Sequence, residues 1–230
     1  MLRTRDVVLT GPAGAGKDTL AKALTEAYGY YRIAFADVLK SALLEVDPLV
    51  DGHVRLRGLV ESVGWDGAKT KDEVRRLLQV TGMAMRAVDP TIWIRGTEIA
   101  LDRVPLGTPV VITDARMPNE WAWGAETLNE PLFVRVERDG VDMSKGWRAH
   151  ESETALPPRL FQPDVIVAGS WLPWTEAKRI AAITNAVPLT IGSSDDYEDD
   201  VEQGKCYCGG CAYVDGPSRN RSGVSEVAAG

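Results

Sequence analysis

A glycine-rich segment near the N-terminus carries the clearest chemistry in the chain. Residues 7–19 read VVLTGPAGAGKDT, in which Gly11, Gly16 and Lys17 have the spacing G-x-x-x-x-G-K. Glycines let successive backbone N–H groups turn towards one anion, and the lysine adds a mobile charge. Because an apolar run precedes the segment and a helical pattern follows it, we expect a P-loop for a nucleoside triphosphate. The residues expected around the phosphates are Gly11, Ala13, Gly14, Ala15, Gly16, Lys17, Asp18 and Thr19.

One position departs from the usual motif, in which Ser or Thr follows the lysine. Here Asp18 follows it, and the hydroxyl comes one residue later at Thr19. Magnesium could contact either side chain or Asp114, which ends an apolar run where P-loop proteins keep an acid. The sequence leaves open which of the three binds the ion. A glycine-rich turn that binds nothing is the alternative, and the agreement of run, spacing, lysine and helix disfavours it.

A second polar set lies on a helix that the sequence predicts over residues 70–86. Arg75, Gln79, Gly82 and Arg86 recur at i, i+4, i+7 and i+11, so they share one face of that helix. Two cations and an amide around a glycine are suited to lining a groove for an anion. From spacing alone, a solvated helix face is an equal alternative.

More arginines follow than hydrolysis of a triphosphate requires. Arg116 comes two residues after Asp114, and Arg138 opens a polar segment, residues 138–150, of the kind expected in a lid. A phosphorylated acceptor explains these charges, and it needs no strong base, since a phosphate monoester is largely dianionic at neutral pH. Catalysis would then depend on alignment and charge neutralisation, with Lys17, Asp114 and Arg138 as the catalytic candidates.

The elements that must position these residues alternate along the chain. Strands are predicted at residues 7–10, 30–35, 110–113, 132–137 and 165–168. Helices are predicted at residues 17–28, 37–46, 70–86, 90–102, 118–128 and 175–186, and residues 51–69 fit a loop or a short helix. This order predicts an α/β fold with a five-stranded, mostly parallel sheet and helices on both faces. Ligands bind at the carboxyl ends of such strands.

Local signals set two of the predicted helix starts. Thr70 and Glu73 have the spacing of a capping box, and Asp89 with Pro90 resembles an N-cap residue followed by a proline in the first turn. The core-facing positions of the first of these helices are predicted to be Val74, Leu77, Leu78, Thr81 and Met85.

Composition limits the class of protein. The chain has 230 residues, 44% of them hydrophobic, which is enough for one sizeable α/β domain with a tail. No apolar run approaches the roughly 20 residues that span a bilayer, and no apolar segment precedes the first strand. A net charge of −7 argues against general affinity for nucleic acid. We therefore expect a cytoplasmic protein with small-molecule substrates and no membrane or nucleic-acid partner.

The character of the chain changes after residue 187. Residues 188–230 contain eight acidic and three basic side chains and no apolar period, which predicts a disordered tail. The tail holds all three cysteines, Cys206, Cys208 and Cys211. Since a closed structural zinc site needs four ligands, we expect unpaired thiols, although two chains of a homodimer could share a metal.

The chain also resembles the phage-type deoxynucleoside monophosphate kinases. The segments that carry the resemblance are GPAGAGKDT at 11–19, FADVLK at 35–40, VRRLLQVTGMAMR and DPTIWI between 74 and 94, VVITDARMPNE at 110–120, and VRVERDG with HESE between 134 and 153. It implies a P-loop kinase fold, ATP as donor, Mg²⁺ as cofactor, and a deoxynucleoside 5′-monophosphate as acceptor. For a phage protein the compartment would be the host cytoplasm. It also implies an acceptor site that contains Asp37, Lys40, Arg75, Gln79 and Arg86, with Arg116 directed at the same region.

Two other functions fit the same residues. A P-loop kinase with a hydroxyl acceptor, such as a dephospho-coenzyme A kinase, would need a base, and Asp37 is the candidate. A nucleotide-responsive binding protein would recruit a partner through its tail and would show no acceptor-stimulated turnover.

Overall fold

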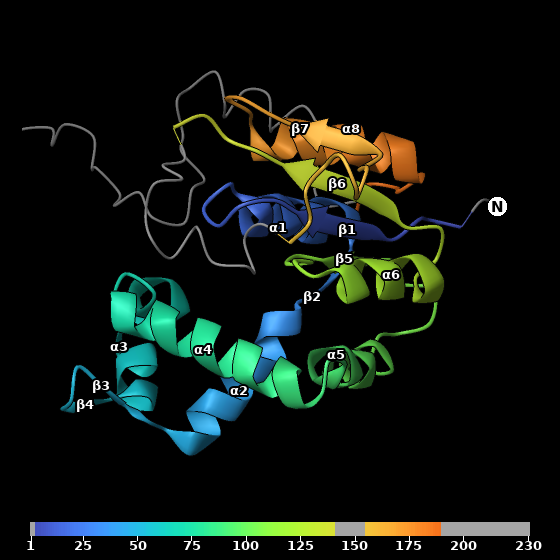
Figure 1. Ribbon diagram of the computed structural model, residues 1–230. Helices are drawn as coiled ribbons and strands as arrows, with labels where there is room; N and C mark the ends of the chain where they lie inside the picture. Colours follow the sequence, from blue (N-terminus) through green and yellow to red (C-terminus); the bar gives the residue numbers. More distant parts are fainter. Residues whose placement is uncertain (1–2, 141–154, 190–230) are drawn as a thin grey trace, which may run out of the picture. The chain divides into compact units, whose positions relative to one another are not determined.

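The computed structural model describes residues 3–140 and 155–189 (Figure 1). None of the helices in these ranges is both long enough and apolar enough to cross a membrane. The predicted cysteine-bearing tail, from residue 190 on, lies outside the described residues. The elements in chain order are β1 (Val7–Thr10), α1 (Lys17–Tyr28), β2 (Tyr31–Ile33), α2 (Phe35–Val46), β3 (Leu49–Val50), β4 (Val54–Arg55), α3 (Leu56–Ala68), α4 (Asp72–Val88), α5 (Ile92–Leu101), β5 (Val110–Ile112), α6 (Pro118–Thr127), β6 (Leu132–Val136), β7 (Val165–Val167) and α8 (Pro173–Thr184).

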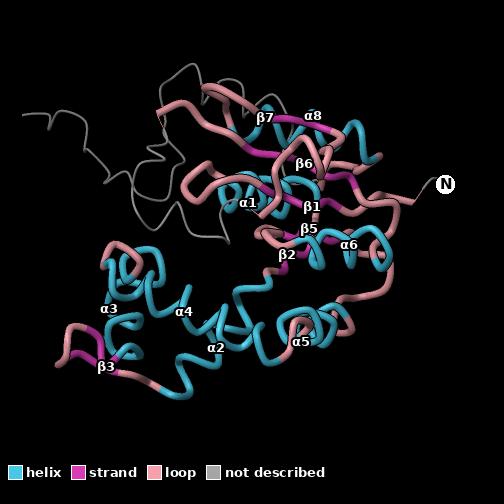
Figure 2. Tube along the Cα trace, viewed as in Figure 1, coloured by secondary structure: helices cyan, strands magenta, loops and turns pink. Residues whose placement is uncertain are grey.

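Five of the strands form one parallel sheet in the order β2-β5-β1-β6-β7 (Figure 2). The central strand is β1, in which Val8 pairs with Ile112 on one side and Phe133 on the other. The predicted α/β fold with a five-stranded parallel sheet is confirmed. Since all five strands run in one direction, the segments that follow them meet at a single edge.

The side chains of β1 alternate between two hydrophobic layers, because successive residues of a strand point to opposite faces. Val7 and Leu9 pack with buried residues of α1 and α8, such as Leu24 and Ile180. Val8 packs instead with a layer built from α2, α4, α5 and α6. Helices therefore cover both faces of the sheet.

Residues 51–69 fold into more regular structure than the sequence predicts. A short antiparallel hairpin of β3 and β4 leads into α3, which bends at Gly64. The bend has φ 67° and ψ 172°, a conformation that a glycine adopts without a steric penalty. The hairpin, α3 and α4 extend beyond the sheet on the side of β2 (Figure 1). Of this region, α4 and Lys69, which follows α3, line the site described below.

The helix predicted over residues 70–86 exists, but its capping box does not. Its first residue is Asp72, and the hydroxyl of Thr70 donates to the carbonyl of Gly67 at 2.7 Å. Glu73 accepts from the N–H of Asp51 instead of capping its own helix. The prediction that Met85 faces the core is also wrong, because this residue is 39% exposed.

The reason lies in the face that α4 buries. Val74 and Gly82 are the buried residues of this helix, and Leu78, halfway between them, packs against the core. These positions are four residues apart, so the core stripe passes to one side of Met85. The next helix, α5, begins at Ile92, two residues later than predicted, and Asp89 accepts from the N–H of Thr91 at 3.0 Å.

Candidate active site

The segment between β1 and α1 has the backbone of a phosphate-binding loop. Gly11, Gly14 and Gly16 have φ values of 125°, 82° and 99°, which favour glycine. A Cβ on Gly11 would lie 2.1 Å from the carbonyl oxygen of Val136, so no side chain fits there. No side chain caps the start of α1. The first N–H groups of that helix are therefore available to an anion.

Lys17 lies inside this loop and is only 6% exposed. Its Nζ donates to the carbonyl oxygens of Gly11 and Pro12 at 2.7 and 2.8 Å. Burial, and next the positive charge of Arg116, lowers the pKa of Lys17 from 10.5 to about 7. A phosphate group would supply the negative charge that stabilises the protonated ammonium.

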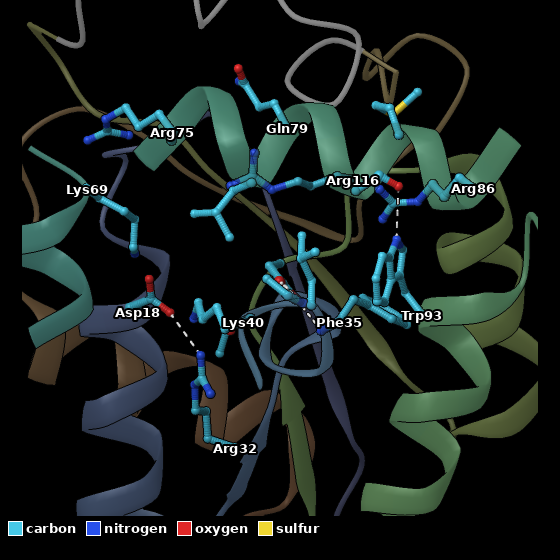
Figure 3. Close-up of a pocket in the computed structure, with 18 residues that line it drawn as sticks. Asp18, Arg32, Phe35, Lys40, Lys69, Arg75, Gln79, Arg86, Trp93 and Arg116 are labelled. Atoms are coloured by element: carbon cyan, nitrogen blue, oxygen red, sulfur yellow. Dashed lines mark hydrogen bonds and ion pairs between the residues drawn. The ribbon is translucent and has the colours of Figure 1, made fainter. Parts of the chain in front are cut away.

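A pocket of about 160 Å³ lies between the loop and α4 (Figure 3). Ala13 and Asp18 of the P-loop segment line one end of it. Apolar surface comes from Phe35 and Trp93, among other residues. Its lining includes six cationic side chains, which are Arg32, Lys40, Lys69, Arg75, Arg86 and Arg116. Only two carboxylates, Asp18 and Asp114, line it, so the pocket suits an anion with an aromatic or apolar part.

Most of the residues predicted for the acceptor lie together here. Arg75, Gln79 and Arg86 of α4 all line the pocket, and so does Arg116, which lies beneath the helix in Figure 3. Lys40 of α2 also lines it. The residues that share this face by helical spacing, Arg75, Gln79, Gly82 and Arg86, therefore line one pocket, and their role as an acceptor site stays a prediction.

Asp37 does not line the pocket, although the sequence places it near the acceptor. Its carboxylate accepts hydrogen bonds from Lys40, at 3.0 Å, and from Arg32. Burial raises the pKa of Asp37, but the charges and hydrogen bonds of Lys40 and Arg32 more than offset this and hold the pKa below its usual value. Asp37 therefore orients two cations and is a weak base.

Asp114 stands at the end of β5, as predicted, and lines the pocket. One carboxylate oxygen accepts from the N–H of Phe35 at 2.8 Å, and the other accepts from the N–H of Ala36 at 2.9 Å. The carboxylate thus fixes the start of α2, from which Phe35 enters the pocket. Its proposed contact with magnesium stays a prediction.

Glu120, in the first turn of α6, was not among the predicted site residues. Its side chain is buried, and one oxygen accepts from the guanidinium of Arg86 at 2.5 Å. The other oxygen accepts from the N–H groups of Arg116, at 2.8 Å, and Met117, at 3.1 Å. Burial raises the pKa of Glu120, and the charge of Arg86 opposes that shift. A signal was present in the sequence, since proline followed two residues later by glutamate is typical of a helix start.

Arg32, Lys69 and Trp93 also line the pocket and were not predicted. Arg32 lies 3.7 Å from Asp18, at the end of the pocket next to the P-loop (Figure 3). The indole N–H of Trp93 donates to the carbonyl of Gly82 at 3.1 Å, which joins α5 to α4. No pattern in the sequence connects these positions, because each belongs to a different element.

Arg138, a predicted catalytic residue, lies outside the pocket lining. Its guanidinium stands over the ring of Trp171, 5.8 Å from the ring centroid. A Cβ on Gly16 would be 4.0 Å from Arg138 and 2.9 Å from Trp171, so both side chains lie beside the P-loop. Arg138 is therefore near the expected donor phosphates and outside the pocket lining. Of the predicted lid, residues 141–150 lie outside the described residues.

Magnesium would find oxygen ligands in the first turn of α1. Asp18 and Thr19 are exposed there. Within residues 3–140 and 155–189, no cluster of three or more His, Cys, Asp or Glu side chains could hold a metal by itself. Mg²⁺ is commonly bound by one or two protein oxygens together with substrate phosphates and water, so these residues fit the ion.

Comparisons with known proteins give limited similarity. The chain matches no protein-family model. It is 38% identical over 69 residues to an adenylate kinase of Geotalea uraniireducens, and this match spans 30% of the chain and 29% of the adenylate kinase. The chain therefore matches less than a third of that relative's length.

Solved structures are similar over a larger share of the chain, but at lower sequence identity. TT1252 from Thermus thermophilus has a TM-score of 0.46 at 18% identity, covering 80% of this chain and 99% of that one. The APS kinase CysC of Mycobacterium tuberculosis has a TM-score of 0.41 at 16% identity, covering 81% of this chain and 100% of that one. Because both scores are below 0.5, the fold rests on the strand order and the loop conformation described above.

Proposed function

We propose that this protein is a magnesium-dependent kinase that transfers the γ-phosphoryl group of ATP to a deoxynucleoside 5′-monophosphate. The observation that carries the proposal is the continuity of two sites. Ala13 and Asp18 of the P-loop segment line the same pocket as Arg75, Arg86 and Arg116. A triphosphate in the loop and a phosphate held by these arginines would meet at the shared end.

The chemistry needs alignment more than acid or base groups. An oxygen of the acceptor phosphate forms a bond to the γ-phosphorus, and the bond from that phosphorus to the β,γ-bridging oxygen breaks. The products are ADP and a nucleoside diphosphate. Lys17 and the N–H groups of the loop would hold the donor, and Arg86 and Arg116 would neutralise the acceptor. Bound Mg²⁺, held by one or more of Asp18, Thr19 and Asp114, would neutralise charge on the donor phosphates.

The aromatic surfaces support a nucleotide over a simple phosphate as the acceptor. Phe35 and Trp93 line the pocket and are 2% and 4% exposed, so only small parts of their rings face it. Together with the other apolar residues of the lining, they favour a ligand with an apolar part, such as a nucleobase, over a simple phosphate. The short match to an adenylate kinase agrees with a nucleotide acceptor.

The state of Asp37 argues against a hydroxyl acceptor. A hydroxyl group must lose its proton to a base, whereas a phosphate dianion need not. Asp37 is paired with Lys40 and Arg32, and its pKa lies below the usual range. We therefore expect Asp37→Asn to lower turnover only a few-fold, through the lost orientation of two cations.

The test is a panel of purified protein, ATP, Mg²⁺ and each ribo- and deoxynucleoside monophosphate in turn, with diphosphate products separated by chromatography. Lys17→Met protein, purified in parallel, controls for contaminating kinases. Diphosphate formed by the wild type with a deoxynucleoside monophosphate supports the proposal. Turnover that requires a hydroxyl acceptor and collapses in Asp37→Asn would establish the alternative kinase. Tight ATP binding without turnover of any tested acceptor would indicate a nucleotide-responsive binding protein.

A further inference from the structure

Glu120 is a buried carboxylate that lies outside the pocket lining and joins two parts of its wall. One of its oxygens contacts α4, through Arg86, and the other contacts the segment between β5 and α6, through the N–H groups of Arg116 and Met117. The first of these elements contributes Arg75 and Arg86 to the pocket, and the second contributes Arg116. The side chain of Glu120 thus connects the two elements that carry Arg86 and Arg116.

The two contacts constrain the arginines in different ways. The side chain of Arg86 is 19% exposed and is held by the charge-assisted bond to Glu120 at 2.5 Å. Without this bond, a long guanidinium side chain would sample several rotamers and lose that freedom when a ligand binds. Arg116 is constrained through its own backbone, because its N–H donates to the same carboxylate at 2.8 Å.

The guanidinium of Arg86 still has N–H donors for a ligand while it is bonded to Glu120. Arginine has five N–H donors, and the bond to Glu120 uses one, on Nη2. Arg86 lines the pocket and Glu120 does not, so the carboxylate holds Arg86 from outside the lining. This is the arrangement expected of an arginine whose direction is set before an anion arrives.

We propose that Glu120 is a positioning residue for the acceptor phosphate, fixing Arg86 through its side chain and Arg116 through its backbone. The inference rests on the proposed function, because the phosphate is that of the acceptor nucleotide. It predicts that the charge of Glu120 affects acceptor binding and leaves ATP binding unchanged.

Glu120→Gln tests this with little change of shape. The amide oxygen can still accept from the N–H groups of Arg116 and Met117, whereas the charge that holds Arg86 is lost. We expect the KM for the monophosphate to rise roughly tenfold or more, with the KM for ATP unchanged. Equal changes in both KM values, or no change in either, would overturn the proposal.

Asn119→Ala is the matched control for a purely structural effect. Asn119 precedes Glu120 in the first turn of α6. Its amide nitrogen donates to the carbonyl of Pro90 at 2.8 Å, and its side-chain oxygen accepts from the backbone N–H of Glu120 at 3.1 Å. The substitution loosens the same helix start without removing a contact to Arg86. We expect it to lower the Tm and leave the acceptor KM as in the wild type.

A double-mutant cycle shows whether Glu120 acts through Arg86. In an Arg86→Met background the ion pair is already absent, so adding Glu120→Gln is expected to raise the acceptor KM little further. Full additivity of the two effects would contradict the proposal. If Glu120→Gln does not fold, as judged by circular dichroism, Glu120→Asp replaces it, since the shorter carboxylate also withdraws from Arg86.

Phosphate binding separates this inference from the proposed reaction. With the P-loop filled by a non-hydrolysable ATP analogue and Mg²⁺, inorganic phosphate is titrated calorimetrically into the wild type and Glu120→Gln. A wild type that phosphorylates no monophosphate defeats the proposed function, yet weaker phosphate binding in Glu120→Gln still supports the role of Glu120. Equal phosphate affinity in the two proteins, or none in the wild type, overturns it.

Discussion

The P-loop and the acceptor pocket meet at one sheet edge but are built from different parts of the polypeptide. The loop uses consecutive residues, whose glycine conformations and N–H groups form the anion site. The pocket wall uses side chains from four helices and from the segment after β5. Two carboxylates, Asp114 and Glu120, hold those elements together. The first site is a property of the backbone, and the second is a property of charged side-chain contacts.

This difference determines how each site can fail. Apart from the charge of Lys17, the loop depends on the conformation of its backbone, so steric changes there should lower stability most. A side-chain site is lost when a charge or its support is removed, and the fold can survive. Four experiments test this distinction, beginning with the largest expected effect.

Lys17→Met should lower kcat on the order of a thousandfold, because the loop loses the charge that binds the transferring phosphate. Methionine preserves the buried apolar stem, so circular dichroism should show a folded protein. The matched control is Lys22→Met on the exposed side of the same helix, which should leave kcat unchanged. Equal losses in both variants would show that the effect is a general one of charge on α1.

Gly11→Ala should lower the free energy of unfolding by about 3 kcal/mol, since its φ is 125° and the new methyl group would meet the carbonyl of Val136. Gly52→Ala is the control, with φ 77° and no atom within 4 Å of the added carbon. It should cost about 1 kcal/mol, from the left-handed backbone alone. Urea unfolding measures both, and similar costs would mean that the loop is not sterically fixed.

Arg75→Met should raise the KM for the monophosphate about tenfold, equivalent to about 1.4 kcal/mol, with little effect on the KM for ATP or on stability. Its neighbour on α4, Arg76, is 71% exposed, pairs with Glu73 and does not line the pocket. Arg76→Met therefore serves as the control and should behave as the wild type. A rise in the KM for ATP in Arg75→Met would place this arginine at the donor.

ATP binding at pH 8 should take up about one proton at Lys17. The pKa of this lysine is about 7 in the unliganded protein, so it is mostly neutral at pH 8, and the bound triphosphate raises the pKa. ATP affinity should consequently fall as the pH rises above 7. Calorimetry in buffers of different ionisation enthalpy measures the uptake. Lys17→Arg, which stays charged, should abolish it, and no uptake by the wild type would contradict the prediction.

Much of the fold could be predicted because its signals are local. Apolar runs and helical periods were sufficient to place the five strands and the P-loop. Residues 51–69 were harder, since four glycines obscure a helix that bends at one of them. Thr70 gave a false start for α4, because its hydroxyl bonds back to Gly67 at the end of α3.

The pocket could be predicted only where one helix face carries it. Arg75, Gln79 and Arg86 repeat at helical spacing, and the family resemblance added Lys40. Glu120 acts on Arg86 across 34 residues of sequence, and Asp114 contacts Phe35 across 79. Such contacts depend on how the helices pack, and no local pattern encodes them.

The contact of Asp114 with α2 also makes the two helix starts at this sheet edge electrostatically different. The start of a helix attracts anions, and both α1 and α2 begin at this edge. At α2 the N–H groups of Phe35 and Ala36 are already bound by the carboxylate of Asp114. A triphosphate entering the wrong way round would meet a negative charge there, whereas at α1 it would meet an uncapped helix start. Under the proposed function, we therefore expect the carboxylate of Asp114 to disfavour binding of the triphosphate at α2.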